Sequence, residues 1–238
     1  MSHPTEPFQH QTVSIVVPVR NEPPQVLRQI NALVNLQCVV EVIVVDASER
    51  RLQSALAEIL DPSITLIRTE TAGRAAQMNL GSSHASGQIL WFLHSDSTVP
   101  ADAATTISNS VTDSCPWGRF DVQFRSSASL MRLVAKMMNL RSALTNICTG
   151  DQAIFVDRAV FAQVGSFPQI AIMEDVALSR KLKSTGSMVR IRTPIQTSAR
   201  RWESCGHLRT IVLMWMMRLL YWAGVSPDRL ARLYRQVR

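Results

Sequence analysis

Short apolar runs alternate with helical segments through the first hundred residues of the chain. Four runs have the length and the β-branched composition of buried strands, the first ending at Pro18: 13–17, 39–45, 64–67 and 88–93. The segments between them carry apolar residues at helical spacing: 23–36, 51–60 and 73–85. Strands that alternate with helices of this length predict βαβ units, so we expect a Rossmann-like α/β domain with a mostly parallel central sheet.

After Pro100 the pattern is less regular, but it still predicts helices and strands. The expected helices are near 101–111, 130–144 and 174–184, and the expected strands at 118–124, 152–156 and 189–192. The Met- and Leu-rich segment 130–144 is expected to be a lid or a connecting segment. Because no repeat or low-complexity tract occurs, one large domain with a short appendage is the expected organisation.

The positive charge of the chain is concentrated near its C-terminus. Residues 1–179 hold 12 Lys and Arg against 16 Asp and Glu, whereas residues 180–238 hold 13 against 2, a net charge of +11. Such a segment favours contact with phosphate groups, the alternative being a solvated basic face. Nucleic acid is not an expected partner, because no zinc-finger, RRM or helix-turn-helix pattern accompanies the charge.

Cysteine usage and the N-terminal residues indicate a reducing compartment. The four cysteines lack C-x-x-C spacing, which argues against a zinc site or a disulfide framework. The first dozen residues are polar and lack the apolar core of a secretory leader. We therefore expect a cytoplasmic protein with a flexible N-terminus at 1–12.

Carboxylates follow two of the predicted strands. Asp46 comes directly after the run 39–45, and Asp96 follows the run 88–93 after His94 and Ser95. Ligands of open α/β sheets bind beyond the carboxyl ends of the strands, so these two carboxylates indicate one binding pocket. The alternative for each is a cap on the following helix.

Further polar motifs occur in order along the chain. The series is Pro18 to Glu22, Asp46, Gly73-Arg74 with Asn79, His94-Ser95-Asp96, Glu174-Asp175 at a helix start, and Arg201-Trp202. No G-x-G-x-x-G follows the first strand, so a standard dinucleotide enzyme is not expected. Over roughly residues 13–203 the series resembles glycosyltransferase family 2, in a compact bacterial form.

This resemblance implies a GT-A fold and the inverting transfer of a single sugar from a nucleotide-diphospho-sugar to an acceptor hydroxyl. It divides the chain into a GT-A domain at 13–203, with a nucleotide half at about 13–100 and an acceptor half at about 101–203, and a basic helical extension at 204–238. Two other functions stay open. One is a sugar-phosphate nucleotidyltransferase, although such enzymes need a glycine-rich phosphate loop. The other is a nucleotide-binding regulator without catalysis.

The resemblance assigns the donor nucleotide to residues of the first half. Pro18 and Glu22 would meet the base and the ribose, and Asp46 would accept a hydrogen bond from either. Arg74, at a helix start, would contact the diphosphate or the base. Helix capping is the alternative for Glu22 and Asp46.

His94-Ser95-Asp96 occupies the place of the family's D-x-D motif. Asp96 would hold Mn²⁺ or Mg²⁺ against the diphosphate oxygens, because both ions favour oxygen ligands. His94 departs from the motif. It would bind the metal directly or through water, or touch the sugar.

The pair Glu174-Asp175 implies the base of the transfer. Asp175 corresponds to the family's catalytic Asp, which removes the proton from the acceptor hydroxyl, and Glu174 would orient the acceptor or the helix. The alternative is two acids that stabilise a helix N-terminus. Asp151, in an acceptor-side loop, is the second candidate for the base.

Arg201-Trp202 resembles the end of the Q-x-x-R-W motif of processive members. Ser198 stands where that Gln would be, which argues against processive polymerisation. Trp202 would stack on a sugar and Arg201 would hold a phosphate, the alternative being a core Trp beside a surface Arg.

An apolar stretch of 13 residues, 211–223, is interrupted by Arg218. It falls short of the ~20 residues that span a bilayer. It is therefore either a core helix or an interfacial helix, with Trp215, Tyr221 and Trp222 at a membrane surface. The later arginines would attract anionic headgroups, and a lipid-linked acceptor would suit that location. The sequence does not specify the sugar, the nucleotide or the acceptor.

Overall fold

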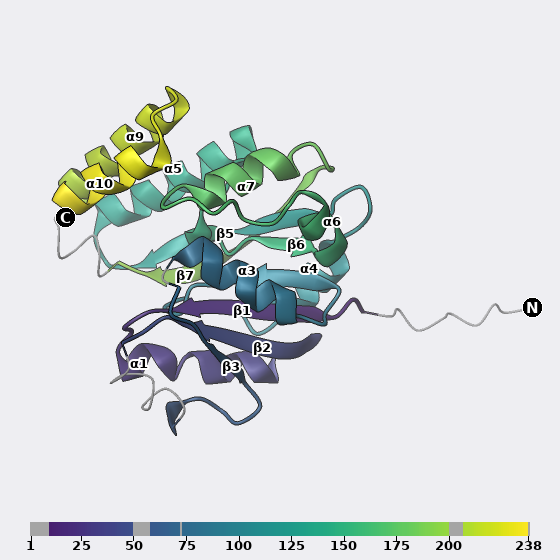
Figure 1. The fold of residues 1–238 in the computed structure, drawn as a ribbon. Coiled ribbons are helices and arrows are strands. Elements are labelled where there is room, and N and C mark those ends of the chain that lie inside the picture. The colour runs from purple at the N-terminus through teal and green to yellow at the C-terminus, as the bar shows by residue number, and fades with distance from the viewer. Residues whose placement is uncertain (1–9, 50–57, 72, 200–206, 238) are drawn as a thin grey trace, which may run out of the picture.

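The computed structural model describes residues 10–49, 58–71, 73–199 and 207–237. Within these ranges a seven-stranded sheet has the order β3-β2-β1-β4-β6-β5-β7 (Figure 1). The strands are β1 (Val13–Val19), β2 (Val39–Asp46), β3 (Thr65–Arg68), β4 (Ile89–Phe92), β5 (Trp117–Arg125), β6 (Phe155–Asp157) and β7 (Met188–Ser198). Among these strands only β6 runs antiparallel to its neighbours. The predicted α/β architecture with a mostly parallel sheet is confirmed.

Helices pack on both faces of the sheet because its central strands are apolar on both faces. Ile15 belongs to a core cluster with residues of α1, η1 and α4, whereas Val16 belongs to a cluster with residues of α3, α6 and α7. The described helices are α1 (Pro24–Leu27), the 3₁₀ helix η1 (Ile30–Asn35), α3 (Arg74–His84), α4 (Ala103–Ser110), α5 (Ser129–Thr145), the 3₁₀ turn η2 (Gly150–Gln152), α6 (Arg158–Gln163), α7 (Glu174–Leu182), α9 (His207–Trp222) and α10 (Pro227–Val237).

The helix expected at 23–36 consists of two shorter elements, α1 and η1. In a 3₁₀ helix residues three apart lie on the same side, which allows Ile30 and Leu33 of η1 to be buried together. The helix expected at 51–60 lies mostly outside the described residues.

The first strand continues through Pro18, where the sequence predicted its end. β1 reaches Val19, and Pro18 pairs with Val45 of β2. The ladder to β4 ends with Phe92 opposite Val16, whose carbonyl accepts from the N–H of Leu93. The backbone of Pro18, like that of Val16, is directed toward β4, but Pro18 lies beyond the end of the β1–β4 ladder. The N–H that proline lacks would therefore have made no hydrogen bond in the sheet.

Helix α5 packs against the sheet and does not form a lid. Met131 and Met138 of α5 pack against Val122 and Phe124 of β5, which makes segment 130–144 a core helix. This corrects the expectation of a lid or connector. A helix with one apolar face buried against a strand is stably packed even when its opposite face is exposed to solvent.

The C-terminal helices α9 and α10 pack on the start of α7, beside α5 (Figure 1). Met217 and Leu230 join a cluster with Val176, and the guanidinium of Arg180 lies 4.9 Å from the ring centre of Tyr221. Tyr221, expected at a membrane interface, therefore packs inward. None of the described helices has both the length and the apolar character that crossing a membrane requires.

Candidate active site

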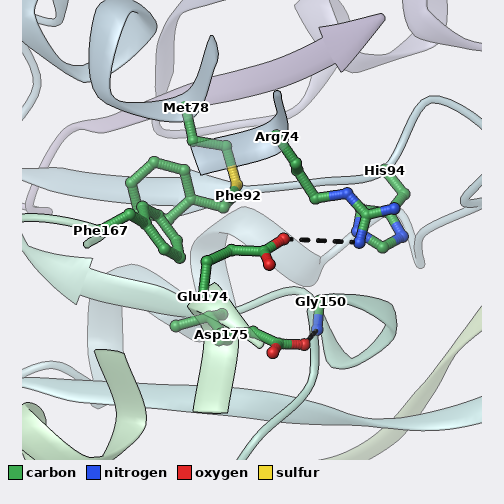
Figure 2. A pocket seen from close by; sticks show the side chains of 9 residues that line it. Arg74, Met78, Phe92, His94, Gly150, Phe167, Glu174 and Asp175 are labelled. Atoms are coloured by element: carbon green, nitrogen blue, oxygen red, sulfur yellow. Dashed lines mark hydrogen bonds and ion pairs between the residues drawn. The ribbon is translucent and has the colours of Figure 1, made fainter. Parts of the chain in front are cut away.

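A cavity lies where α3 and α7 begin, next to the end of β4 (Figure 2). Its lining residues come from both halves of the chain: Arg74, Met78, Phe92, His94, Gly150, Ile154, Phe167, Glu174 and Asp175. Four predicted site residues, Arg74, His94, Glu174 and Asp175, thus meet in one place although they are up to a hundred positions apart in sequence. Met78, Phe92 and Phe167 lie to one side of Glu174, and Arg74 and His94 lie to the other (Figure 2).

Glu174 is the buried acid of the cavity. It is 6% exposed, and its Oε1 lies 3.8 Å from Nη1 of Arg74. Burial raises the pKa of Glu174, the adjacent charge of Asp175 raises it further, and Arg74 opposes both effects. Glu174 therefore holds its proton more tightly than an exposed glutamate.

Asp175 is half-buried and is oriented by backbone donors. Its Oδ2 accepts a hydrogen bond of 2.8 Å from the N–H of Gly150, and its Oδ1 one of 2.7 Å from the N–H of Val176. Its carbonyl accepts from Ser179, whose hydroxyl oxygen also accepts from the N–H of Cys148. The start of α7 is therefore attached to the turn before β6, and the carboxylate keeps lone pairs for a ligand.

His94 extends from the end of β4 to the turn at η2. Its Nδ1 lies 3.2 Å from Oδ1 of Asp151, which joins Asp151 to the cavity. Its Nε2 is buried, has no hydrogen-bond partner in the described residues, and faces Gly150. A Cβ at position 150 would lie 2.5 Å from that nitrogen, so a larger residue at position 150 would require the ring of His94 to move.

Pro18, Glu22 and Asp46 gather at the carboxyl ends of the neighbouring strands β1 and β2, where Val19 pairs with Asp46. Asp46 is fully buried. Its Oδ1 accepts from the N–H of Ser48, while its Oδ2 has no hydrogen-bond partner in the described part of the chain. A buried carboxylate oxygen of this kind is costly unless a ligand supplies a donor.

Sequence reasoning missed two residues that build the site. Gln77 of α3 is buried and donates two hydrogen bonds of 2.8 Å, to the carbonyls of Val19 and Val45, which fixes α3 on the strand ends. Its signal was a long polar side chain on the apolar face of a helix. Gly150 precedes Asp151 in the acceptor-side loop, and nothing in the sequence indicates its contact with His94.

Residues 14–157, more than half of the chain, match the family described as Glycosyl transferase family 2. The chain belongs to this family. The family resemblance drawn from the order of the motifs is thereby confirmed. None of the curated proteins compared with the sequence matches it.

Two solved structures share the fold of this family 2 protein. The mannosyltransferase PcManGT from Pyrobaculum calidifontis, in complex with GDP-Man and Mn²⁺, gives a TM-score of 0.62 at 20% identity, over 85% of this chain and 63% of that chain. TarS 1–349 of S. aureus gives 0.58 at 14% identity, over 85% of this chain and 65% of that chain. The chain thus spans less than two thirds of each neighbour's length. The likeness confirms the predicted GT-A type of fold.

Asp96 is the candidate metal ligand of this family 2 protein. It is half-buried after β4 and does not line the cavity, and its carbonyl accepts from Nη2 of Arg125 at 2.6 Å. The described residues contain no group of three or more His, Cys, Asp or Glu placed to hold a metal. One carboxylate still fits Mg²⁺ or Mn²⁺, because such ions take most of their ligands from water and substrate phosphates. Arg201 and Trp202 lie outside the described residues.

Proposed function

We propose that the protein is an inverting glycosyltransferase that moves a single sugar from a nucleotide-diphospho-sugar to an acceptor hydroxyl. One observation carries this proposal: Asp175 and Glu174 meet Arg74 and His94 in one cavity, next to the end of β4. Family membership supports the same reaction.

Asp175 is the proposed base. It takes the proton from the acceptor hydroxyl while the hydroxyl oxygen attacks the anomeric carbon, and the bond from that carbon to the diphosphate breaks on the opposite face. The hydrogen bonds from Gly150 and Val176 orient the carboxylate before the acceptor arrives. Asp151, held by His94, is the alternative base.

Glu174 is a proposed positioning and electrostatic residue. Its contact with Arg74 keeps that cation at the cavity, where it faces the diphosphate of the donor. Pro18, Glu22 and Asp46 form the proposed site for base and ribose. The unpaired, buried Oδ2 of Asp46 supports this assignment, because a base or ribose supplies the missing donor.

Asp96 is the proposed ligand of a divalent ion, Mn²⁺ or Mg²⁺. The PcManGT structure, which contains GDP-Man and Mn²⁺, supports the use of such an ion in this fold. When bound, the ion neutralises the charge that builds on the leaving nucleoside diphosphate. His94 remains a candidate ligand, but it would first have to turn, because Nδ1 contacts Asp151 and Nε2 faces Gly150.

The second half of the proposal concerns location, at the cytoplasmic surface of a membrane. Two helices that contact each other, α5 and α9, expose apolar side chains at helical spacing: Leu133, Met137, Leu140 and Leu144 on α5, and Val212, Trp215, Met216, Leu219 and Trp222 on α9. The sequence indicated only the second of these stripes. Exposed tryptophans beside the basic helix α10 suit an interface with anionic lipid, which would bring a lipid-linked acceptor to Asp175.

The test is a panel of nucleotide-sugars offered to the full chain with Mn²⁺. A donor that binds the native state raises the melting temperature. That donor is then incubated without acceptor, and slow release of free sugar, lost in Asp175→Asn, would separate an enzyme from a nucleotide-binding regulator. Stabilisation by no nucleotide-sugar, together with no hydrolysis, would contradict the proposal.

A further inference from the structure

Arg141 is a half-buried cation whose guanidinium group has two buried nitrogens. It lies near the end of α5, and its Nε and Nη2 are buried without any hydrogen-bond partner among the described residues. Unpaired guanidinium nitrogens in a protein interior are costly, because the charge loses its hydration and gains nothing in exchange. A ligand that accepts hydrogen bonds from these nitrogens would offset this cost.

A second arginine, Arg218, belongs to α9, the helix that contacts α5. Burial lowers the pKa of Arg141 to about 10, and the positive charge of Arg218 is the next cause. Burial also lowers the pKa of Arg218, and the charges of Asp175 and Asp151 act in the opposite direction. Because α5 and α9 contact each other, the two arginines belong to neighbouring helices.

The turn that carries Asp151 is also connected to α5. Gln152 is fully buried, and its Nε2 lies 3.4 Å from Oδ1 of Asn139, two residues before Arg141. The same amide oxygen accepts from the N–H of Val122 at 2.9 Å. The turn that carries Asp151 is thus attached to α5 two residues before Arg141.

We propose that Arg141 and Arg218 bind a phosphate group carried by the acceptor. This inference rests on the proposed function, in which Asp175 deprotonates the acceptor. Two guanidinium groups present paired N–H donors that match the oxygens of a phosphomonoester. The donor diphosphate belongs to the other side of the reaction, with Arg74 of α3 and the end of β4.

The phosphate has two possible carriers, a lipid and a soluble phosphorylated sugar. The helices that hold the two arginines, α5 and α9, are also those that expose the apolar stripes. A lipid phosphate lying on those stripes would reach the arginines from the membrane side. A soluble sugar phosphate would use the same two cations without the stripes.

The first experiment measures binding of inorganic phosphate to the full chain by calorimetry, at constant ionic strength set with chloride. We expect saturable binding that weakens by at least about tenfold in Arg141→Gln and in Arg218→Gln. Arg132→Gln and Lys136→Gln, on exposed positions of α5, are matched controls and should bind as the wild type does. Arg218→Gln serves alone if Arg141→Gln does not fold.

The second experiment identifies the carrier by competition with bound phosphate. Vesicles with phosphatidic acid, which ends in a phosphomonoester, are compared with phosphatidylglycerol vesicles of equal charge and with glucose 6-phosphate. Competition by phosphatidic acid alone supports a lipid carrier, and competition by glucose 6-phosphate supports a soluble one. Competition by neither, or phosphate binding that survives both substitutions, would overturn the inference.

Donor binding distinguishes this inference from the proposed function. In Arg141→Gln the Mn²⁺-dependent affinity for the nucleoside diphosphate should stay within about twofold of the wild type. An equal loss of phosphate and nucleoside diphosphate affinity would assign the pair to the donor and refute the acceptor site. A wild type that hydrolyses the donor but binds no phosphate would refute this inference alone.

Discussion

The N–H of Gly150 donates a 2.8 Å hydrogen bond to Oδ2 of Asp175, across the gap between η2 and α7. This contact gives the proposed base a fixed orientation toward the turn that carries Asp151. Gly150 therefore helps to position the proposed base through its main chain, although glycine has no side chain. The same turn touches His94, so both candidate bases depend on it.

Asp175→Asn should lower the transfer rate by about 10²–10⁴, because the amide keeps the shape of the carboxylate but cannot accept a proton. Donor affinity should barely change, since the base acts on the acceptor. Steady-state rates and calorimetric donor binding measure the two effects. Asp151→Asn is the matched comparison, and if it proves the more damaging variant, Asp151 is the base.

Asp96→Ala should abolish the Mn²⁺-dependent part of the affinity for the nucleoside diphosphate while the protein still folds. The ion loses its protein carboxylate and remains bound only to the nucleotide. Titration calorimetry with and without EDTA measures this part. Asp102→Ala, an exposed acid at the start of α4, is the control. Unchanged metal-dependent affinity in Asp96→Ala would exclude Asp96 as the ligand.

Gly150→Ala should destabilise the protein by about 1–3 kcal/mol and lower its activity. The added Cβ would lie 2.5 Å from Nε2 and 2.9 Å from Cε1 of His94, so the ring must move away from Asp151. Chemical denaturation measures the stability. The double variant Gly150→Ala/His94→Ala lacks the ring and should recover most of the lost stability. If it does not, the destabilisation comes from the backbone at position 150 and not from contact with His94.

Glu174→Gln should stabilise the protein more at about pH 8 than at about pH 4. The pKa of Glu174 is raised by burial and by Asp175, so the folded state binds this proton more tightly than the unfolded chain. Wild-type stability therefore falls as pH rises from the usual pKa of 4.5 through the folded pKa. Glutamine does not ionise, so the variant avoids this loss of stability. Melting temperatures of wild type and variant between about pH 4 and pH 8 test the prediction, with Glu58→Gln at an exposed position as the control.

Replacing Trp215 and Trp222 with serine should remove binding to anionic vesicles. These side chains are 58% and 77% exposed on α9, so the change affects a surface rather than a core. Flotation of the full chain with vesicles measures the binding. Val40→Ser on β2, where the valine is 50% exposed, is the matched control. Equal flotation of all variants would assign the apolar stripes a role other than lipid contact.

The periodicity of the sequence predicted most of the sheet because its strands are buried on both faces and read as continuous apolar runs. It failed where local rules and tertiary context disagree. Pro18 predicted the end of β1, but the strand continues to Val19. The ladder to β4 ends before Pro18, so the missing N–H of the proline breaks no hydrogen bond there. The Met- and Leu-rich composition of segment 130–144 suggested a lid or a connecting segment, whereas one face of α5 packs on β5.

The candidate site could be predicted only as far as charged residues at strand and helix ends reveal it. Asp175 and Arg74 stand at such positions, and the cavity brings them together. Gln77, Gly150 and Arg141 could not be found in this way. Their roles depend on contacts between segments that are distant in sequence, and a glutamine, a glycine and an arginine in a helix or loop have many ordinary uses.

Both donors that orient Asp175 are main-chain groups, the N–H of Gly150 and the N–H of Val176. Main-chain donors persist through most substitutions of the side chains that bear them. Other side chains that line the cavity can therefore be exchanged over evolutionary time without turning the carboxylate. A scaffold built in this way can acquire new acceptors by altering the rim of its pocket while its central carboxylate stays oriented.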